Sequence, residues 1–406
     1  MRRILFVDDE QGILDGLRRM LRPHRKDWDM EFAPGAEAAL EMMAAAPFDV
    51  IVSDMRMPGT DGAALLEVVR KKYPGMLRII LSGYTDLQAS LRAVPVAHQF
   101  LLKPCNPDSL RAGILRSTAL SAMLDSRMLA SLVGSLRDMP AMRSSYGELR
   151  ALLERGDASV EAIHAIAERD VAITAKVLQL VNSAFFGVAG EIADLFSAIK
   201  CLGVNIVQEL VLKVEAFREF QPTEEISAEY LEDLNEHSRL TAHIARDIAK
   251  ARRVTGGVEA AAMLHDVGKL VILERTPAHF SRALLQSQDE GVSMHKVEQK
   301  LAGFSHAEVG AYLLSLWGLP NSIVEAVANH HDPKRLPRSS FDATAVVYTA
   351  NCLANEVDSK LTRSGIERAP VLDVPYLAQL GVGNAIPQFR RIAEDAALAL
   401  HGAAKR

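Results

Sequence analysis

The chain has few cysteines and no long apolar segment. Three cysteines occur among its 406 residues. Cys105, Cys201 and Cys352 lie far apart, so they offer no disulfide framework of the kind found in small secreted domains. No apolar run reaches the ~20 residues of a membrane-spanning helix, and the N-terminus leads into a strand pattern in place of a signal peptide. We therefore expect a cytoplasmic protein without a membrane partner.

Concentrated positive charge is also missing. The net charge is −5, and the sequence contains no basic arm, no zinc-finger spacing and no long run of Lys or Arg, so we expect no DNA partner. Hydrophobic residues make up 49% and charged residues 24%, as in an ordinary soluble globular protein. A chain of 406 residues is too long for one core, which predicts two or three domains.

Four short apolar runs in the N-terminal part each stop at polar residues. These residues are Asp8 and Asp9, Asp54, Ser82, and Lys103. Alternating strand and helix patterns over residues 1–122 predict a doubly wound parallel sheet. Ligands of such sheets collect beyond the carboxyl ends of the strands. We therefore expect carboxylates, a hydroxyl and an ammonium group to meet in one pocket.

Carboxylates gathered in this way need a cation between them. Hard oxygen ligands suit a Mg²⁺ ion that keeps several waters, and an aspartate beside such an ion can attack phosphorus as a nucleophile. In this interpretation Asp54 takes up a phosphoryl group, Lys103 neutralises its oxygens and Ser82 donates a hydrogen bond to them. The alternative is that each acid only caps a strand or a turn.

Residues 1–122 resemble the receiver domain of bacterial two-component response regulators. The resemblance implies a five-stranded parallel sheet and a sensor histidine kinase as partner. It also implies roles for individual residues: Asp54 as phosphoacceptor, Asp8, Asp9, Asp54 and the Met55 carbonyl as the Mg²⁺ site, Ser82 and Phe100 as switch residues, and Lys103 as the phosphate-sensing lysine. Phe100 stands where the family often has tyrosine.

The pattern beyond the sheet is helical. One helix is predicted from Asp108 to about Val133. Its first part belongs to the sheet domain, and its last part contributes to a connector over 123–138. Met139-Pro140 marks the start of the next domain. Further helices are predicted at 146–155, 159–168, 171–185, 205–217, 228–251, 257–273, 306–317 and 320–331. We see no convincing strand here. Residues 139–355 are therefore predicted to form an all-α domain, on which a helical extension, residues 356–406, packs.

Histidines concentrate in this second domain. Eight of the twelve lie between residues 237 and 331. His265 and Asp266 adjoin in the sequence Leu-His-Asp-Val-Gly-Lys, and adjacent His and Asp on a helix can both reach one divalent ion, with histidines of neighbouring helices completing its ligands. Such a metal can lower the pKa of bound water for phosphoester hydrolysis. The alternative is that the histidines only hold helix ends through hydrogen bonds.

These motifs resemble the HD superfamily of metal-dependent phosphohydrolases. Residues 130–355 resemble more closely its HDOD relatives, which are signalling or scaffold modules that often lack a complete metal site. The positions that match HD metal ligands are His237, His265, Asp266, His306, His330 and His331. Asn351 stands where the closing aspartate is expected, and an amide is a poorer ligand than a carboxylate for Mn²⁺ or Fe²⁺. The Gly-Tyr-Pro signature of cyclic-di-GMP phosphodiesterases is absent after His331.

Three interpretations follow from these patterns. In the leading one, the protein is a phosphorelay response regulator in which Asp54 controls a non-catalytic HDOD domain. The HDOD domain contacts a downstream protein, and the regulator can act as a homodimer. In the alternative, Asp54 gates a metal-dependent phosphohydrolase for a nucleotide or cyclic dinucleotide, with Lys269 near the phosphate. In the third, the histidines are structural. Metal analysis of the purified protein would separate them.

Overall fold

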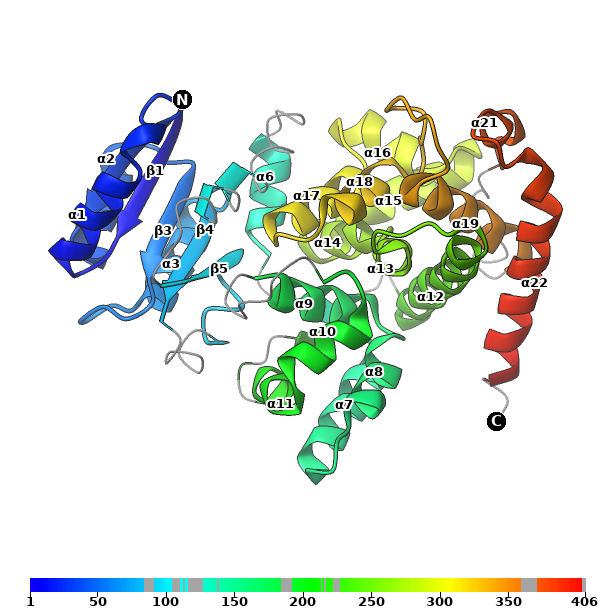
Figure 1. The fold of residues 1–406 in the computed structure, drawn as a ribbon, viewed down its shortest axis with the longest axis horizontal. Coiled ribbons are helices and arrows are strands. Elements are labelled where there is room, and N and C mark those ends of the chain that lie inside the picture. Colours follow the sequence, from blue (N-terminus) through cyan, green and yellow to red (C-terminus); the bar gives the residue numbers. More distant parts are fainter. Residues whose placement is uncertain are drawn as a thin grey trace.

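A sheet region and a larger helical region lie side by side (Figure 1), with the N-terminus in the first and the C-terminus at the far end of the second. The computed structural model describes residues 1–83, 91–103, 110–111, 114–115, 127–136, 139–183, 192–212, 214, 217–221, 227–358 and 371–403.

The sheet region contains five parallel strands in the order β2-β1-β3-β4-β5. The strands are β1 (Arg2–Val7), β2 (Trp28–Ala33), β3 (Val50–Asp54), β4 (Leu77–Ser82) and β5 (Gln99–Leu102). The helices described in this region are α1 (Gln11–Met20), η1 (Arg22–His24), α2 (Ala36–Ala45) and α3 (Gly62–Lys72). Val7 pairs with Ser53, and Asp54 pairs with Leu81, so the polar ends of the strands lie at one edge. The predicted doubly wound fold is confirmed.

The described residues beyond the sheet are mostly helical, as predicted. The helices are α6 (Arg127–Gly134), α7 (Arg143–Arg155), α8 (Val160–Ala167), α9 (Val171–Asn182), α10 (Leu195–Leu202), α11 (Val204–Leu212), α12 (Ala228–Arg252), α13 (Val258–Met263), α14 (Val267–Arg275), α15 (Pro277–Glu290), α16 (Met294–Ala302), α17 (His306–Leu316), α18 (Asn321–Asn329), α19 (Ala343–Val357), α21 (Val374–Gln379), η4 (Gly383–Ala385) and α22 (Ile386–Ala403). The long helix α12 packs against α13, α19 and α22. The C-terminal helix α22 therefore rests on the helical core.

Three local predictions are wrong. Two strands, β6 (Met139–Ala141) and β7 (Phe217–Glu219), form a parallel pair in the helical region. Strands of three residues are too short to show an alternating pattern. The helix predicted at 205–217 ends at Leu212. The helix predicted at 257–273 is two helices, α13 and α14, separated by a turn. The helix predicted from Asp108 falls largely outside the described residues, and α6 covers its last part.

The edge strand β5 joins the two regions. Gln99 Nε2 donates a hydrogen bond of 3.2 Å to the carbonyl oxygen of Leu316 in α17. Lys176 of α9 is 2% exposed, donates to Val94 O at 3.4 Å and lies 4.9 Å from the centre of the Trp317 ring. Buried polar contacts of this kind fix the orientation of one domain on the other.

No described helix is by itself long and apolar enough to span a membrane. The consecutive helices α10 and α11 reach that length and composition together, but the chain bends by 89° between them.

Candidate functional site

Two carboxylates and one ammonium group meet beyond the carboxyl ends of β1, β3 and β5. Lys103 Nζ lies 2.6 Å from Asp8 Oδ2 and 2.5 Å from Asp54 Oδ1. The backbone N–H of Arg56 donates to Asp54 Oδ2 at 2.9 Å. Asp8 and Asp54 are buried. The structure therefore brings together Asp8, Asp54 and Lys103, which the sequence predicted to share one pocket.

Opposed influences set the charges of this pocket. Burial raises the pKa of Asp54, although the hydrogen bond from Lys103 acts in the opposite direction. Burial also works against the charge on Lys103, but its hydrogen bonds to Asp54 and Asp8 outweigh that effect and raise its pKa. A firmly cationic lysine in contact with Asp54 suits the arrival of an anionic phosphoryl group.

The remaining predicted residues belong to strands of the sheet or closely follow them. Asp9 is exposed and lines an open groove together with Met55. Ser82 is buried at the end of β4, and its carbonyl oxygen accepts a hydrogen bond of 2.8 Å from the backbone N–H of Lys103. Phe100 is 3% exposed and pairs in register with Ile80. The aromatic side chain thus occupies an inward position.

The donor set fits Mg²⁺. Asp8, Asp9, Asp54 and the Met55 carbonyl offer only hard oxygen atoms, which Mg²⁺ prefers. Three carboxylates exceed the single positive charge of Lys103, so the pocket has charge left for a divalent ion. The Met55 carbonyl oxygen accepts one hydrogen bond, from the N–H of Gly62 at 3.0 Å, and a carbonyl has a second lone pair for an ion.

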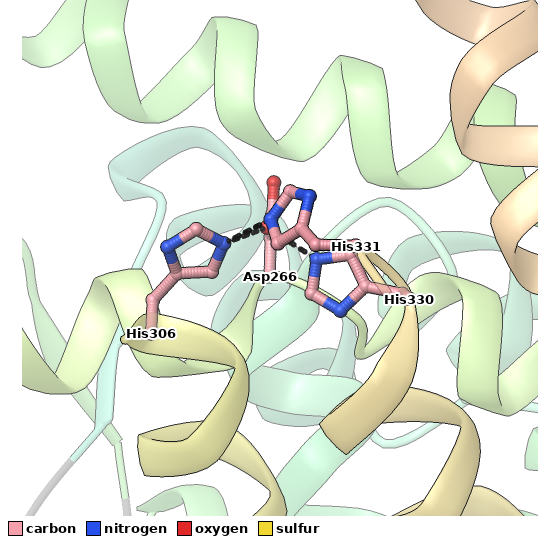
Figure 2. A group of neighbouring side chains, drawn as sticks. All are labelled: Asp266, His306, His330 and His331. Carbon is pink, nitrogen blue, oxygen red and sulfur yellow. Dashed lines mark hydrogen bonds and ion pairs between the residues drawn. The ribbon is translucent and has the colours of Figure 1, made fainter. Parts of the chain in front are cut away.

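A second cluster gathers histidines around Asp266. His306 begins α17, and His330 and His331 follow α18. Figure 2 shows the three rings around the carboxylate: His306 Nε2 lies 3.2 Å and His330 Nε2 lies 3.6 Å from Asp266 Oδ1. His331 Nε2 lies 2.8 Å from His306 Nε2. The four ligand atoms all lie within 4.8 Å of one another, close enough to share one ion.

Asp266 also belongs to a second group, with His237 and His265. His265 Nε2 lies 3.4 Å from Asp266 Oδ2. His237 Nε2 lies 3.0 Å from the side-chain oxygen of Asn351. Asn351 therefore lies beside His237, as expected for the residue that replaces the closing aspartate. This group has one carboxylate fewer for a second ion than a site with that aspartate would have.

His265 and Asp266 lie in the turn between α13 and α14, and not on a helix as predicted. Residues 260–273 are all buried on both sides of the break, so the apolar run continues through it and periodicity does not reveal it. Lys269, in the first turn of α14, donates to Asp266 Oδ2 at 2.8 Å. The turn lets Asp266 face the histidines of both groups.

Hydrogen bonds orient two of these rings as metal ligands. His265 Nδ1 lies 2.6 Å from Ala262 O, and His330 Nδ1 lies 2.7 Å from Val327 O. A carbonyl oxygen only accepts, so Nδ1 carries the proton and Nε2 presents a lone pair. Within the described part of the chain neither Nε2 has a hydrogen-bond partner. Lone pairs that face a carboxylate call for a cation among them, and metal-bound histidines are held in this way.

His306 has a carboxylate behind it. Glu298 of α16 is 1% exposed, and its Oε2 lies 2.6 Å from His306 Nδ1. Burial opposes charge on His306, but Glu298 and Asp266 outweigh it and raise the pKa to about 9. Sequence reasoning missed Glu298, because it stands eight residues before His306 in a helix without any motif.

The other charges of the cluster favour metal ligation. Burial lowers the pKa of His330 to about 4 and holds that of His331 well below its usual range, so both are neutral near pH 7. Burial alone would raise the pKa of Asp266, but the Lys269 ammonium and the nearby histidines hold it well below its usual range. His306, with its pKa of about 9, has to lose a proton before it can bind a metal. Asp266 with the neutral imidazoles of His330 and His331 and a deprotonated His306 would then suit a transition metal such as Mn²⁺ or Fe²⁺.

Comparisons with known proteins divide the chain into two parts. Residues 4–115 match the family model of the response regulator receiver domain, and residues 139–333 match that of the HDOD domain. An uncharacterised protein of Treponema pallidum is 26% identical over 246 residues, which cover 60% of this chain and 47% of that protein. The hydrogenase transcriptional regulatory protein HoxA of Cupriavidus necator is 39% identical over 113 residues, 26% of this chain and 22% of that protein.

Among solved structures, a virulence factor from Campylobacter jejuni aligns with 67% of this chain and 95% of its own, at 19% identity and a TM-score of 0.48. The chain spans less than half of the length of the two curated relatives named above.

Proposed function

The chain combines a response regulator receiver domain with an HDOD domain, and from this premise we propose that Asp54 accepts a phosphoryl group from a sensor histidine kinase and so controls the HDOD domain. Residues 1–122 are the input, 123–138 the connector and 139–355 the output. The observation that carries the proposal is the contact of Lys103 Nζ with Asp54 Oδ1 at 2.5 Å and Asp8 Oδ2 at 2.6 Å.

The chemistry uses the carboxylate pocket. An Asp54 oxygen forms a bond to phosphorus while the bond between phosphorus and the kinase histidine breaks. Asp8, Asp9, Asp54 and the Met55 carbonyl would hold a Mg²⁺ ion, which would supply positive charge for the phosphoryl oxygens. Lys103 exchanges part of its contact with Asp54 for those oxygens. The Ser82 hydroxyl turns toward them as a donor.

The new contacts of Lys103 and Ser82 would favour one arrangement of the segment that touches the second domain. Lys103 and Ser82 terminate β5 and β4, and the segment before β5 touches α9 through Val94 and Lys176. A modification shifts a population only by stabilising one arrangement more than another. We infer that the contact between α9 and the segment before β5 differs between the two phosphorylation states. The HDOD domain then presents a changed surface to a downstream protein or to a second copy of the chain.

Acetyl phosphate with Mg²⁺ is expected to modify the wild type at Asp54, but not Asp54→Asn, as measured by intact-protein mass. The modified wild type should also change its hydrodynamic radius, or its protease sensitivity over residues 122–145. Asp15→Asn, a half-buried residue of α1, is the matched control and should behave as wild type. Modification of Asp54 without any change in radius or cleavage would refute its control over the second domain.

A second candidate, a metal-dependent phosphohydrolase, is favoured by one observation: the Nε2 lone pairs of His265 and His330 face Asp266 without hydrogen-bond partners in the described structure. Hydrolysis of a nucleotide or cyclic dinucleotide would require the metal-bound water of such a site. The pairing of His237 with Asn351 argues for one ion rather than two, and so for a signalling module with at most one bound metal.

Metal analysis after dialysis against Mn²⁺ is expected to find about one equivalent in the wild type. His330→Ala should weaken binding by about tenfold or more, since it removes a ligand. His279→Ala, on α15 outside the cluster, should not change binding. Asn351→Asp should increase the binding of a second equivalent of Mn²⁺, because the substitution restores a carboxylate. Phosphodiesterase turnover that is lost in His330→Ala would favour the enzyme, and a metal-free wild type would show that the histidines are structural.

A further inference from the structure

A cavity of about 290 Å³ lies among α8, α10, α12 and α13. None of the residues that line it belongs to the carboxylate pocket or to the histidine cluster around Asp266. Its volume is at the lower end of the range, ~300–1,000 Å³, that is usual for small-molecule sites. Its apolar lining includes Leu195, Ala242 and Met263, and its polar lining includes Arg239 and His243. The lining therefore has an apolar part and a part rich in hydrogen-bond donors.

The periodicity of α12 separates this cavity from the histidine cluster. Arg239, Ala242, His243 and Arg246 stand at positions i, i+3, i+4 and i+7, which share one face of a helix. His237 points from the opposite side of the same helix into the histidine cluster, where it meets Asn351. The long helix α12 thus carries two chemically different faces.

Two side chains on the cavity face have a donor without a partner in the described structure, whereas Arg246 pairs with Asp247 and Glu259. Arg239 Nε is shielded from solvent and makes no hydrogen bond, and no hydrogen bond or ion pair within the described ranges engages His243. Burial lowers the pKa of both groups; neighbouring arginines act in the same direction, and Glu168 opposes them. A buried N–H without an acceptor is costly, so native proteins nearly always satisfy it. An acceptor from outside the chain would complete this site.

The acids near the cavity are engaged elsewhere. Asp194 caps α10 through its side chain. Glu259 lies 3.5 Å from Arg246, and Glu168 lies 3.8 Å from the ring of His164. Glu168 and Glu236 act on the charge of Arg239 and oppose the fall of its pKa, but Arg239 Nε has no acceptor among the described residues. An anionic group is the partner that a guanidinium and an imidazole N–H bind best.

An aromatic ring borders the same cavity. Phe196 is 38% exposed although it is large and apolar. The neighbouring His164 ring packs against it in a T-shaped arrangement, with the two ring centres 5.5 Å apart and the planes at 76°. Such a ring offers a surface on which a flat group can stack.

We propose that this cavity binds a small anionic compound with a flat ring, its phosphate or carboxylate on Arg239 and His243 and its ring against Phe196. The HDOD domain would then receive a chemical signal in addition to the phosphoryl signal of the receiver. A nucleoside monophosphate and an aromatic carboxylate share the required chemistry.

Calorimetric titration of the full-length protein tests the proposal with GMP, AMP and salicylate as probes, and with guanosine and inorganic phosphate as controls. At least one of the three anionic ring compounds should bind with a Kd below about 1 mM and at least tenfold more tightly than guanosine and phosphate. Binding of GMP or AMP would identify the phosphate source, and binding of salicylate alone the carboxylate source.

Arg239→Met should weaken that binding at least tenfold, whereas Arg252→Met, an exposed arginine of the same helix, should leave it unchanged. Because Arg239 Nε lacks an acceptor, Arg239→Met should also melt at or above the temperature of the wild type, the usual behaviour of a binding residue that costs stability. Three results would overturn the proposal: no probe binds the wild type, both variants bind equally, or Arg239→Met melts several degrees lower. None of them bears on phosphorylation of Asp54.

Discussion

Replacing Gly268 by alanine is expected to destabilise the helical region by about 3 kcal/mol or more, at the upper end of the usual cost of overpacking a core. The added methyl group would overlap the carbonyl oxygen of His306 and lie 2.7 Å from the backbone nitrogen of Gly310. Both atoms belong to the backbone of α17, which cannot rotate away as a side chain can. The variant must therefore separate α14 from α17, and the separation moves His306 away from Asp266.

Thermal melting followed by circular dichroism measures the effect. A loss of about 3 kcal/mol lowers the melting temperature by roughly 6–12 °C in a domain of this size. The matched control is Gly147→Ala in α7, where the added methyl group meets no atom within 4 Å. That variant should gain up to about 1 kcal/mol, since alanine is the better helix former. Equal melting of both variants would contradict the close packing of α14 on α17.

The sheet was predictable because each central strand is an apolar run that ends at a polar residue. A strand that is buried on both faces requires such an apolar run, and the polar residue that follows each run can be identified in the sequence. The edge strand β2 left no such signal, since only Trp28 and Ala33 at its ends are buried. A strand that is half exposed has a mixed composition, and its place becomes clear only through its pairing with β1.

The two clusters differ in how far sequence reasoning reached. For the carboxylate pocket, strand ends alone brought Asp8, Asp54 and Lys103 together, because parallel strands align their carboxyl ends. For the histidines, residue types indicated metal chemistry but not geometry. The turn at His265 and the carboxylate of Glu298 behind His306 depend on how α13, α14 and α16 pack. Long-range packing of this kind has no local sequence signal.

The junction between the two domains was not predictable. Arg78 stands inside the apolar run of β4. A charged side chain is expected to reach solvent, yet Arg78 is 1% exposed. Its guanidinium donates to Val96 O at 2.6 Å and to Gly134 O at 2.8 Å. Burial lowers the pKa of Arg78 to about 9, which leaves it charged at neutral pH. The residue therefore ties the segment before β5 to the end of α6.

Arg78→Met is expected to break this tie and to uncouple the two domains. The substitution keeps an apolar stem but leaves buried carbonyl oxygens without donors, at a cost of about 1–3 kcal/mol for each one that water does not reach. Because Arg78 lies at the start of β4, opposite to the carboxylate pocket, acetyl phosphate should still modify Asp54. The change in hydrodynamic radius or in protease sensitivity over residues 122–145 should disappear.

Two further variants sharpen this test. Arg25→Met, an exposed arginine of the sheet region, should retain both the stability and the response of the wild type. Arg78→Lys keeps the charge but not the planar fork that reaches several carbonyls at once, so it should recover only part of the response. If Arg78→Met remained folded and still changed its radius on modification of Asp54, the signal would have to reach the HDOD domain by a route other than the contact of Arg78 with Val96 and Gly134.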